Sequence, residues 1–133
     1  MERKMERADI AIIGTGPGGV SAALTAKVRN KNILLIGKKQ MSDKVSKAHQ
    51  IMNYPGLPAV TGADMAKAFE KQLAMMEIDI TDSRIGTVYA MGDYFAIQAG
   101  EEMLEAESVI LACGVVSGKT LPGEDEFLGR GVS

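Results

Sequence analysis

The run GTGPGG at residues 14–19 constrains the fold more than any other stretch of this sequence, because it places glycine at the spacing G-x-G-x-x-G. In that pattern Gly14 would make a tight turn after a strand, and Gly16 would let the backbone approach a pyrophosphate. Gly19 would let the following helix pack closely against the strand. The pattern also arises by chance, so the segments on either side must decide its meaning.

Those flanking segments favour a nucleotide-binding loop. Residues 9–13, DIAII, form a continuous apolar run after one acid, which is typical of a strand covered on both faces. Pro17 suits the first turn of a helix, and residues 20–28 repeat apolar side chains at helical spacing: Val20, Ala23, Leu24 and Val28. Residues 32–36, NILLI, predict a second buried strand. The order strand, glycine loop, helix, strand indicates a dinucleotide-binding unit rather than a chance turn.

The segment after the second strand is harder to interpret. Residues 38–60 lack periodicity, so we expect a long loop on the cofactor side of the domain. Thr61 and Asp64 match a capping box. They predict a second main helix whose apolar face holds Met65, Phe69, Leu73 and Met76.

The remaining apolar runs predict strands. Residues 78–80 are a short candidate, and residues 108–113, SVILAC, return the chain to the parallel sheet. Between them we expect an antiparallel meander, with turns at 91–93 and 99–101, made of residues 85–91, 94–99 and 101–106. The fold class is therefore α/β: a Rossmann-like domain with a parallel sheet, two main helices and an inserted antiparallel β-meander. A length of 133 residues fits one domain, residues 1–133.

Composition narrows the class of protein. A net charge of −2 argues against a nucleic-acid surface, and the chain contains no apolar run long enough for a signal peptide or a membrane span. One cysteine gives no disulfide framework. We therefore expect a cytoplasmic protein that binds neither nucleic acid nor membrane.

The end of the second strand departs from the usual dinucleotide site. An Asp or Glu commonly stands there and accepts hydrogen bonds from a ribose. This chain has Gly37, followed by Lys38 and Lys39. Two interpretations remain open on these residues: the lysines read the 2′-phosphate of NADP, or backbone groups hold the ribose of FAD while the lysines are solvated.

Four segments carry a family resemblance: IGTGPGG with its helix, NYPGLPAVTGADM, VILACG and the tail LPGEDEFLGRGVS. Together they resemble the flavin domain of low-molecular-weight thioredoxin reductases, and the resemblance covers nearly the whole chain. It favours FAD over NADP. The segments RNKN and NYPGLP are similar to those of clostridial relatives that take electrons from ferredoxin.

The resemblance implies an oxidoreductase, a flavoprotein that passes electrons through FAD to a cysteine pair and then to a thioredoxin-like protein disulfide. In the complete enzyme NADPH or ferredoxin would supply the electrons, and a homodimer is expected. Residues 1–133 would be the incomplete N-terminal segment of the FAD-binding domain, truncated before the cysteine pair and the nicotinamide domain. We therefore assign no catalytic residue and no metal ligand, and we predict that this chain alone is inactive.

The resemblance also implies which residues contact the cofactor. They are Gly14, Thr15, Gly16, Pro17, Gly18, Gly37, Lys38, Lys44, Val45, Asn53, Val88, Ala112 and Gly114. The alternative is a free-standing NADP- or nucleotide-binding Rossmann module without redox activity.

Two further residues, Cys113 and His49, have reactive or metal-binding side chains, but we predict no catalytic or metal-binding role for either. Cys113 ends an apolar strand, and free cysteines are commonly buried, so we predict a structural role. His49 has no second histidine or acid pair near it in the sequence, so we predict that it is solvated.

Overall fold

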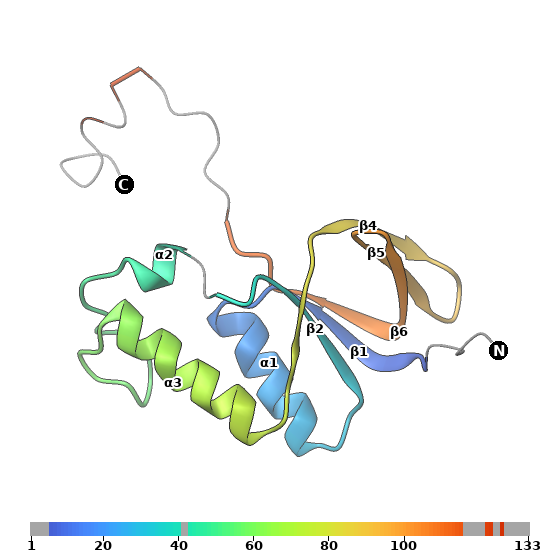
Figure 1. Cartoon of the computed structure of the whole chain (residues 1–133), viewed down its shortest axis with the longest axis horizontal. Coiled ribbons are helices and arrows are strands. Elements are labelled where there is room, and N and C mark those ends of the chain that lie inside the picture. The colour runs from blue at the N-terminus through green and yellow to red at the C-terminus, as the bar shows by residue number, and fades with distance from the viewer. Residues whose placement is uncertain (1–5, 41–42, 116–121, 124–125, 127–133) are drawn as a thin grey trace.

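A computed structural model describes residues 6–40, 43–115, 122, 123 and 126 of the chain (Figure 1). It contains three helices and six strands within those residues. In chain order they are β1 (Ala8–Ile13), α1 (Pro17–Val28), β2 (Ile33–Gly37), α2 (Asp43–Ser46), α3 (Gly62–Met75), β3 (Ile80–Asp82), β4 (Ile85–Ala90), β5 (Phe95–Ala99) and β6 (Glu102–Leu111).

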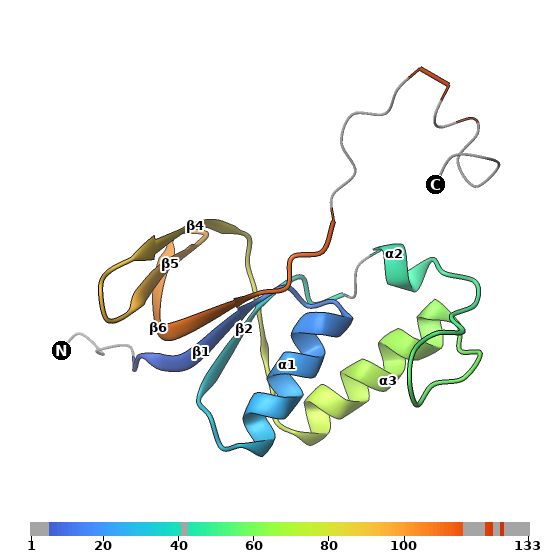
Figure 2. The ribbon, with the colours of Figure 1, turned by 180° about the vertical axis from the view of Figure 1, so that it is seen from behind.

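All six strands belong to one sheet, in the order β3-β2-β1-β6-β5-β4. The pairs β3–β2, β2–β1 and β1–β6 are parallel, whereas β6–β5 and β5–β4 are antiparallel (Figure 2). The mixed sheet with its helices confirms the predicted Rossmann-like α/β class with an inserted meander.

Strand β6 corrects one part of the prediction, which separated a third meander strand from the strand that returns to the parallel sheet. The structure makes them a single strand of 10 residues. Its first half pairs with β5, up to Ala106 opposite Phe95, and its second half pairs with β1, up to Leu111 opposite Ile13. Ala106 also lies opposite Ala8, so one continuous backbone joins the meander to the parallel sheet. Glu107, the residue between the two predicted strands, is an exposed position on this single strand.

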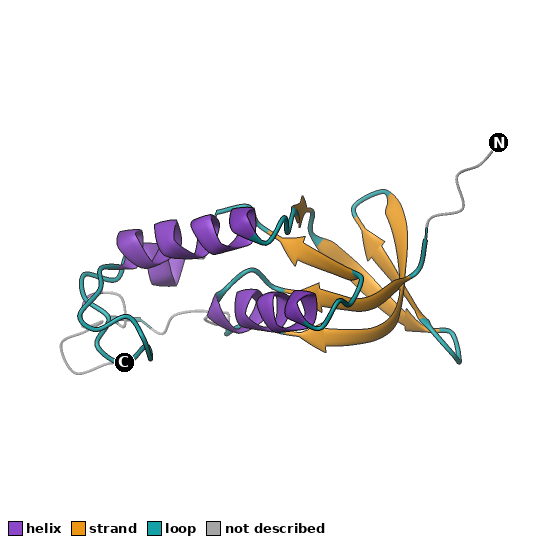
Figure 3. Ribbon diagram, turned by 90° about the horizontal axis from the view of Figure 1, so that it is seen from below, coloured by secondary structure: helices purple, strands orange, loops and turns teal. Residues whose placement is uncertain are grey.

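Two hydrophobic cores lie on opposite faces of the sheet. Ile12 and Leu35 point to one face, where they pack with residues of α1 and α3: Val20, Ala23, Met65, Phe69 and Leu73. Ala11, Ile13 and Ile36 point to the other face and pack with meander residues that include Ile97 and Leu104. Successive residues of a strand alternate between faces, so a strand covered on both must be apolar throughout. Figure 3 shows the two long helices grouped together, with the strands of the meander away from them.

Helix α1 uses small residues to lie close to the sheet. Gly19, Val20, Ala23 and Ala26 are its buried positions. The prediction placed Val28 on the apolar face, and this was wrong, because its side chain is 70% exposed. Ala26 rather than Val28 continues the buried face in the last turn, since it lies three residues after Ala23.

Helix α3 begins as the capping residues predict. The backbone N–H of Asp64 donates a 3.1 Å hydrogen bond to the hydroxyl oxygen of Thr61. Met65, Phe69 and Leu73 are buried, which confirms the apolar face. The helix ends at Met75, with Met76 as its C-cap residue. Glu77 follows with a left-handed φ of 54°, and the N–H of Ile78 donates a hydrogen bond to the carbonyl oxygen of Leu73.

This helix end also moves the third strand. The prediction began it at Ile78, but the structure begins it at Ile80. Ile78 is buried against the core under α3, because it supplies the hydrophobic contact that accompanies such a helix end.

Residues 38–60 are less irregular than expected. They contain the short helix α2 and a bridge between Ile51 and Val60, with backbone hydrogen bonds of 2.7 and 3.2 Å. The ring of Tyr54 lies 5.5 Å from that of Phe69, centroid to centroid. The loop is therefore packed onto α3, and the absence of periodicity in its sequence concealed these long-range contacts.

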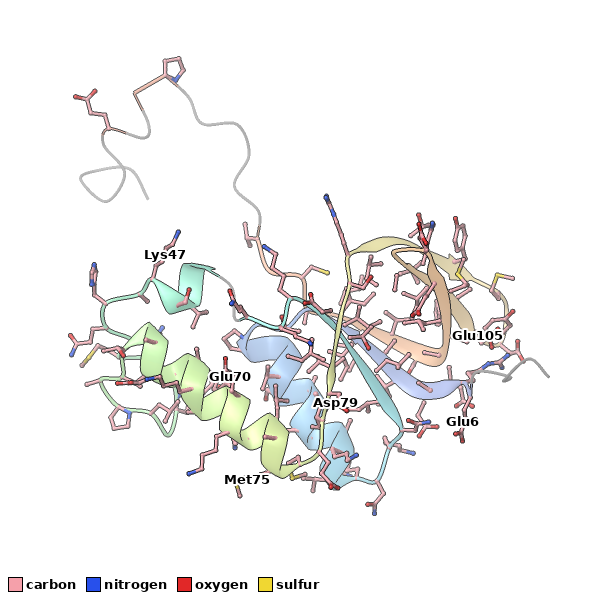
Figure 4. The ribbon with its side chains drawn as sticks, viewed as in Figure 1. Glu6, Lys47, Glu70, Met75, Asp79 and Glu105 are labelled. Carbon is pink, nitrogen blue, oxygen red and sulfur yellow. The ribbon has the colours of Figure 1, made fainter. Side chains whose placement is uncertain are left out.

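The meander has the predicted turns, with Gly92 and Gly100 in left-handed conformations. Arg7 ties the start of β1 to it: its guanidinium lies 3.9 Å from the Tyr94 ring centroid, and its Nε bonds Glu105 at 3.2 Å. Glu105, labelled in Figure 4, is partly buried, whereas Glu101, Glu102 and Glu107 are exposed.

In the described part of the chain, no helix combines the length and the apolar character needed to cross a bilayer. The predicted tail, residues 121–133, lies outside the described residues except for 122, 123 and 126.

Candidate functional site: a cleft at the carboxyl ends of the parallel strands

A cleft of about 430 Å³ opens where β1, β2 and β6 end and α1 begins. From β1 the chain passes to β2 and β3 on one side and later returns through the meander to β6 on the other side, so the strand order reverses next to β1. In open α/β sheets, ligands bind at such a switch point. The cleft is lined by Gly14, Thr15, Gly16, Pro17, Gly18, Gly37, Lys38, Gln40, Ala112, Cys113 and Gly114.

Hydrogen bonds join the three strand ends that form its base. The N–H of Gly14 donates to the carbonyl oxygen of Ile36 at 2.9 Å, and the N–H of Ala112 donates to that of Ile13 at 2.8 Å. The hydroxyl of Thr15 donates to the carbonyl oxygen of Lys38 at 2.7 Å. These bonds connect the loops after β1, β2 and β6 to one another at the base of the cleft.

The glycines of the loop differ in what a side chain at each position would meet. A β-carbon on Gly14 would overlap the carbonyl oxygen of Ala112, and the φ of 122° disfavours any side chain there. A β-carbon on Gly19 would overlap the carbonyl oxygen of Gly14, which confirms the close packing of helix on loop. At Gly16 a β-carbon would meet nothing within 4 Å. Gly14 and Gly19 are therefore required by the fold, whereas Gly16 leaves open space in the cleft.

The start of α1 suits a negatively charged ligand. Gly16 is the N-cap residue and provides no side-chain hydrogen bond, and the first turn contains no acid. Pro17 lies at the first helical position, as predicted. The first-turn N–H groups of a helix lack partners within the helix and carry a partial positive charge. An anion such as a phosphate would satisfy them.

Nine of the thirteen sequence-predicted cofactor contacts line this cleft. They are Gly14, Thr15, Gly16, Pro17, Gly18, Gly37, Lys38, Ala112 and Gly114. Sequence reasoning missed Gln40 and Cys113, which also line it. The position of Cys113 in the sequence could have indicated that it lines the cleft, because it stands between Ala112 and Gly114, which were both predicted to contact the cofactor. Nothing in the sequence indicated Gln40.

The other four predicted contacts are not among the lining residues. Val45 and Val88 are partly buried, Val45 against the core under α3 and Val88 against the core under the meander. Asn53 is exposed in the loop before Tyr54. The side chain of Lys44 lies outside the described residues. A role for these four in binding stays a prediction.

Cys113 corrects the expectation of a buried structural thiol, because the residue is exposed. Its Sγ lies 3.7 Å from the carbonyl oxygen of Ile13. The strand β6 ends at Leu111, so the apolar run carries the chain two residues beyond the sheet and into the wall of the cleft. His49 is exposed, as expected. Within the described residues, no three His, Cys, Asp or Glu side chains are grouped so as to hold a metal ion.

A second and larger hollow, about 610 Å³, lies between α1, α3 and the loop at 54–57. Its walls are side chains such as Leu24, Phe69 and Met75, and the last of these is 73% exposed. Figure 4 shows Met75 projecting away from the body of the molecule at the end of α3. This groove lies away from the strand ends and shares no lining residue with the cleft.

The fold and the cleft together define an α/β dinucleotide-binding domain of Rossmann type. Comparison with known proteins identifies the family within this class of domain. Residues 8–133 match the family model described as pyridine nucleotide-disulphide oxidoreductase. The chain therefore belongs to this family, as the N-terminal FAD-binding type of segment found in thioredoxin reductase-like flavoproteins.

Relatives with sequence similarity include a thioredoxin reductase of Treponema pallidum (strain Nichols), 35% identical over 127 residues. That match covers 94% of this chain and 41% of the relative. A thioredoxin reductase of Bacillus subtilis (strain 168) is 32% identical over 136 residues, with 94% and 40% covered. This chain thus spans about two fifths of the length of the curated relatives it matches.

Solved structures give the same result. A ferredoxin-flavin thioredoxin reductase from Clostridium acetobutylicum superimposes with a TM-score of 0.83 at 47% identity, covering 96% of this chain and 44% of that one. A thioredoxin reductase from Lactococcus lactis gives a TM-score of 0.80 at 27% identity, with 96% and 42% covered.

Proposed function

We propose that this chain is the FAD-binding portion of a thioredoxin-disulfide reductase-like oxidoreductase. The observation that carries the proposal is the cleft at the strand ends, whose glycine loop leaves open space only at Gly16. A dinucleotide needs that space, because its pyrophosphate must approach the backbone. Membership of the family supports FAD as the dinucleotide.

The residues of the cleft fit the diphosphate part of FAD. Gly16, Pro17 and Gly18 would offer backbone surface and the start of α1 to the pyrophosphate. Gly37 and Lys38 would border the adenosine ribose, and Ala112 and Gly114 would form the opposite wall. When bound, the flavin supplies the redox chemistry, and these residues bind it, orient it and exclude water from the diphosphate.

In the complete enzyme electrons would pass through the flavin to a cysteine pair and then to a thioredoxin-like protein disulfide. The 133 residues contain Cys113 as their single cysteine, so a cysteine pair is not available within them. We place the protein in the cytoplasm as a homodimer. The 47% identity to a ferredoxin-flavin thioredoxin reductase favours ferredoxin over NADPH as the electron donor.

Titration calorimetry of the chain with FAD tests the proposal, supported by the absorption of bound flavin at about 450 nm. We expect FAD to bind and NADP to bind more weakly. Anaerobic mixing of the complete, FAD-loaded enzyme with reduced ferredoxin or with NADPH then tests the donor, since reduction bleaches the flavin. Bleaching by NADPH alone would contradict the ferredoxin assignment.

A second candidate is a nucleotide-binding module without redox activity. Gly37 favours it, because no acid stands there to repel a 2′-phosphate, and Lys38 lines the same cleft. Tighter binding of NADP than FAD, lost on Lys38→Ala, would move the chain to this class.

A further inference from the structure

Thr15 and Gly37 form an unusual pair at the end of β2. Thr15 is 9% exposed, and it is the only polar residue in the buried interior of the described chain. Its hydroxyl donates its hydrogen bond to the carbonyl oxygen of Lys38, one residue beyond the strand. The side chain from the glycine loop is therefore fixed against the place where a ribose-binding acid commonly stands.

Gly37 is not a glycine for the usual conformational reason. Its φ is not among the positive values found in the described chain. Instead, a β-carbon at this position would lie 2.8 Å from Cγ2 of Thr15, 3.1 Å from Oγ1 and 3.3 Å from the backbone nitrogen. Threonine is branched at Cβ and stiff at χ1, and its hydroxyl is already bonded, so it does not move away easily. Thr15 thus selects glycine at position 37.

From this geometry we infer that Thr15 and Gly37 are an interlocked, specificity-determining pair. Thr15 occupies the space that the side chain of an acid at position 37 would need, and so it keeps a carboxylate out of the ribose end of the cleft. This inference rests on the proposed function, because it deepens how the same cleft recognises the adenosine half of its dinucleotide.

The absence of a carboxylate at position 37 changes the charge at the ribose end of the cleft. A carboxylate there would accept hydrogen bonds from the ribose hydroxyls and would repel a 2′-phosphate. Gly37 does neither, and the neighbouring Lys38 is exposed at the cleft wall. The adenosine end should therefore accept ADP with or without a 2′-phosphate, and selection for the flavin dinucleotide must come from other parts of the site.

A double-mutant cycle on thermal stability tests the steric half without any ligand. We expect Gly37→Ala to lower Tm by about 5 °C in the parent. Thr15→Ser keeps the hydroxyl and removes Cγ2, so in that background the same change should cost about 2 °C or less. Gly86→Ala in β4 is the matched control, because its β-carbon would make only ordinary contact, 3.6 Å from Gln98. Equal losses in the two backgrounds, or a loss no greater than that of Gly86→Ala, would overturn the interlock.

Nucleotide fragments test the specificity half. The parent should bind ADP and 2′,5′-ADP with affinities within about threefold of each other, whereas Thr15→Ala/Gly37→Glu should favour ADP by about tenfold. A parent that prefers ADP by tenfold overturns the inference, and this ratio decides the matter even where the double variant fails to fold. If the parent binds neither FAD nor ADP, the proposed function fails together with the specificity half. The stability cycle still decides the interlock in that case.

Discussion

The two hollows of this molecule differ in what forms their walls. The cleft at the strand ends has a volume of about 430 Å³ and is bounded by loop backbone, with glycine at five of its lining positions. The groove between α1 and α3 is larger, about 610 Å³, and is bounded mainly by side chains. Hydrogen bonds join the strand ends at the base of the cleft, whereas Met75, which lines the groove, is 73% exposed. Volume is therefore a poor guide to the site here, and the fixed backbone geometry of the cleft is the better one.

The largest expected effect is on the free energy of unfolding, and it should come from substituting a glycine that packs tightly in the loop at the cleft. Gly19→Ala should destabilise the fold by about 4 kcal/mol or more, because the new methyl overlaps the carbonyl oxygen of Gly14. Urea unfolding measures it, with Gly16→Ala as the control, since that methyl meets no atom within 4 Å. Similar stability for the two variants would show that the loop is not closed as described.

Gly16→Val should separate binding from folding. Its φ of −77° suits any residue, so we expect a stability loss of about 1 kcal/mol from a poorer N-cap. The branched side chain would fill the path of the pyrophosphate, and the affinity for FAD should fall at least about 100-fold. Calorimetric titration beside the parent checks this. Unchanged FAD affinity would mean that the loop does not hold phosphate.

Lysine substitutions at the ribose end should have a much smaller effect. Lys38 and Lys39 are exposed, and the attraction of an exposed charge is screened within about 8 Å at physiological salt. We expect Lys38→Ala and Lys39→Ala each to weaken FAD binding by less than about threefold. The same titrations at low and high salt would reveal a stronger role, as a steep salt dependence that disappears in one variant.

A change in the groove should leave the cleft unaffected. Met75→Ala removes a side chain that is 73% exposed, so its effect on stability should stay within about 0.5 kcal/mol. FAD affinity should equal that of the parent. A clear loss of affinity would show that the two hollows are coupled and would undo the contrast between them.

The smallest expected effect is on turnover. The chain alone, with FAD and either NADPH or reduced ferredoxin, should not reduce a thioredoxin or an aromatic disulfide, because it contains one cysteine. Cys113→Ser should therefore change nothing in that assay. Measurable reduction that disappears in Cys113→Ser would give this exposed thiol a redox role.

The sequence by itself determined the features that depend on local spacing. Pro17 at the start of α1 and the Thr61 cap of α3 follow from contacts within a few residues, and the glycine loop follows from the spacing of its glycines; all three were predicted. The apolar runs of β1 and β2 were also readable, because a strand covered on both faces has no polar position to interrupt the pattern.

Only the tertiary structure decided features that depend on distant segments. Ile78 packs under a helix end instead of beginning a strand, and β6 continues past Glu107 because β5 and β1 pair with its two halves in turn. Cys113 reaches the cleft because the sheet ends at Leu111. Gly37 is required by Thr15, a residue 22 positions earlier in the numbering of the chain. For β6 and for Gly37 the deciding neighbours are close in space and remote in sequence, so the periodicity and propensity of the local sequence do not predict them.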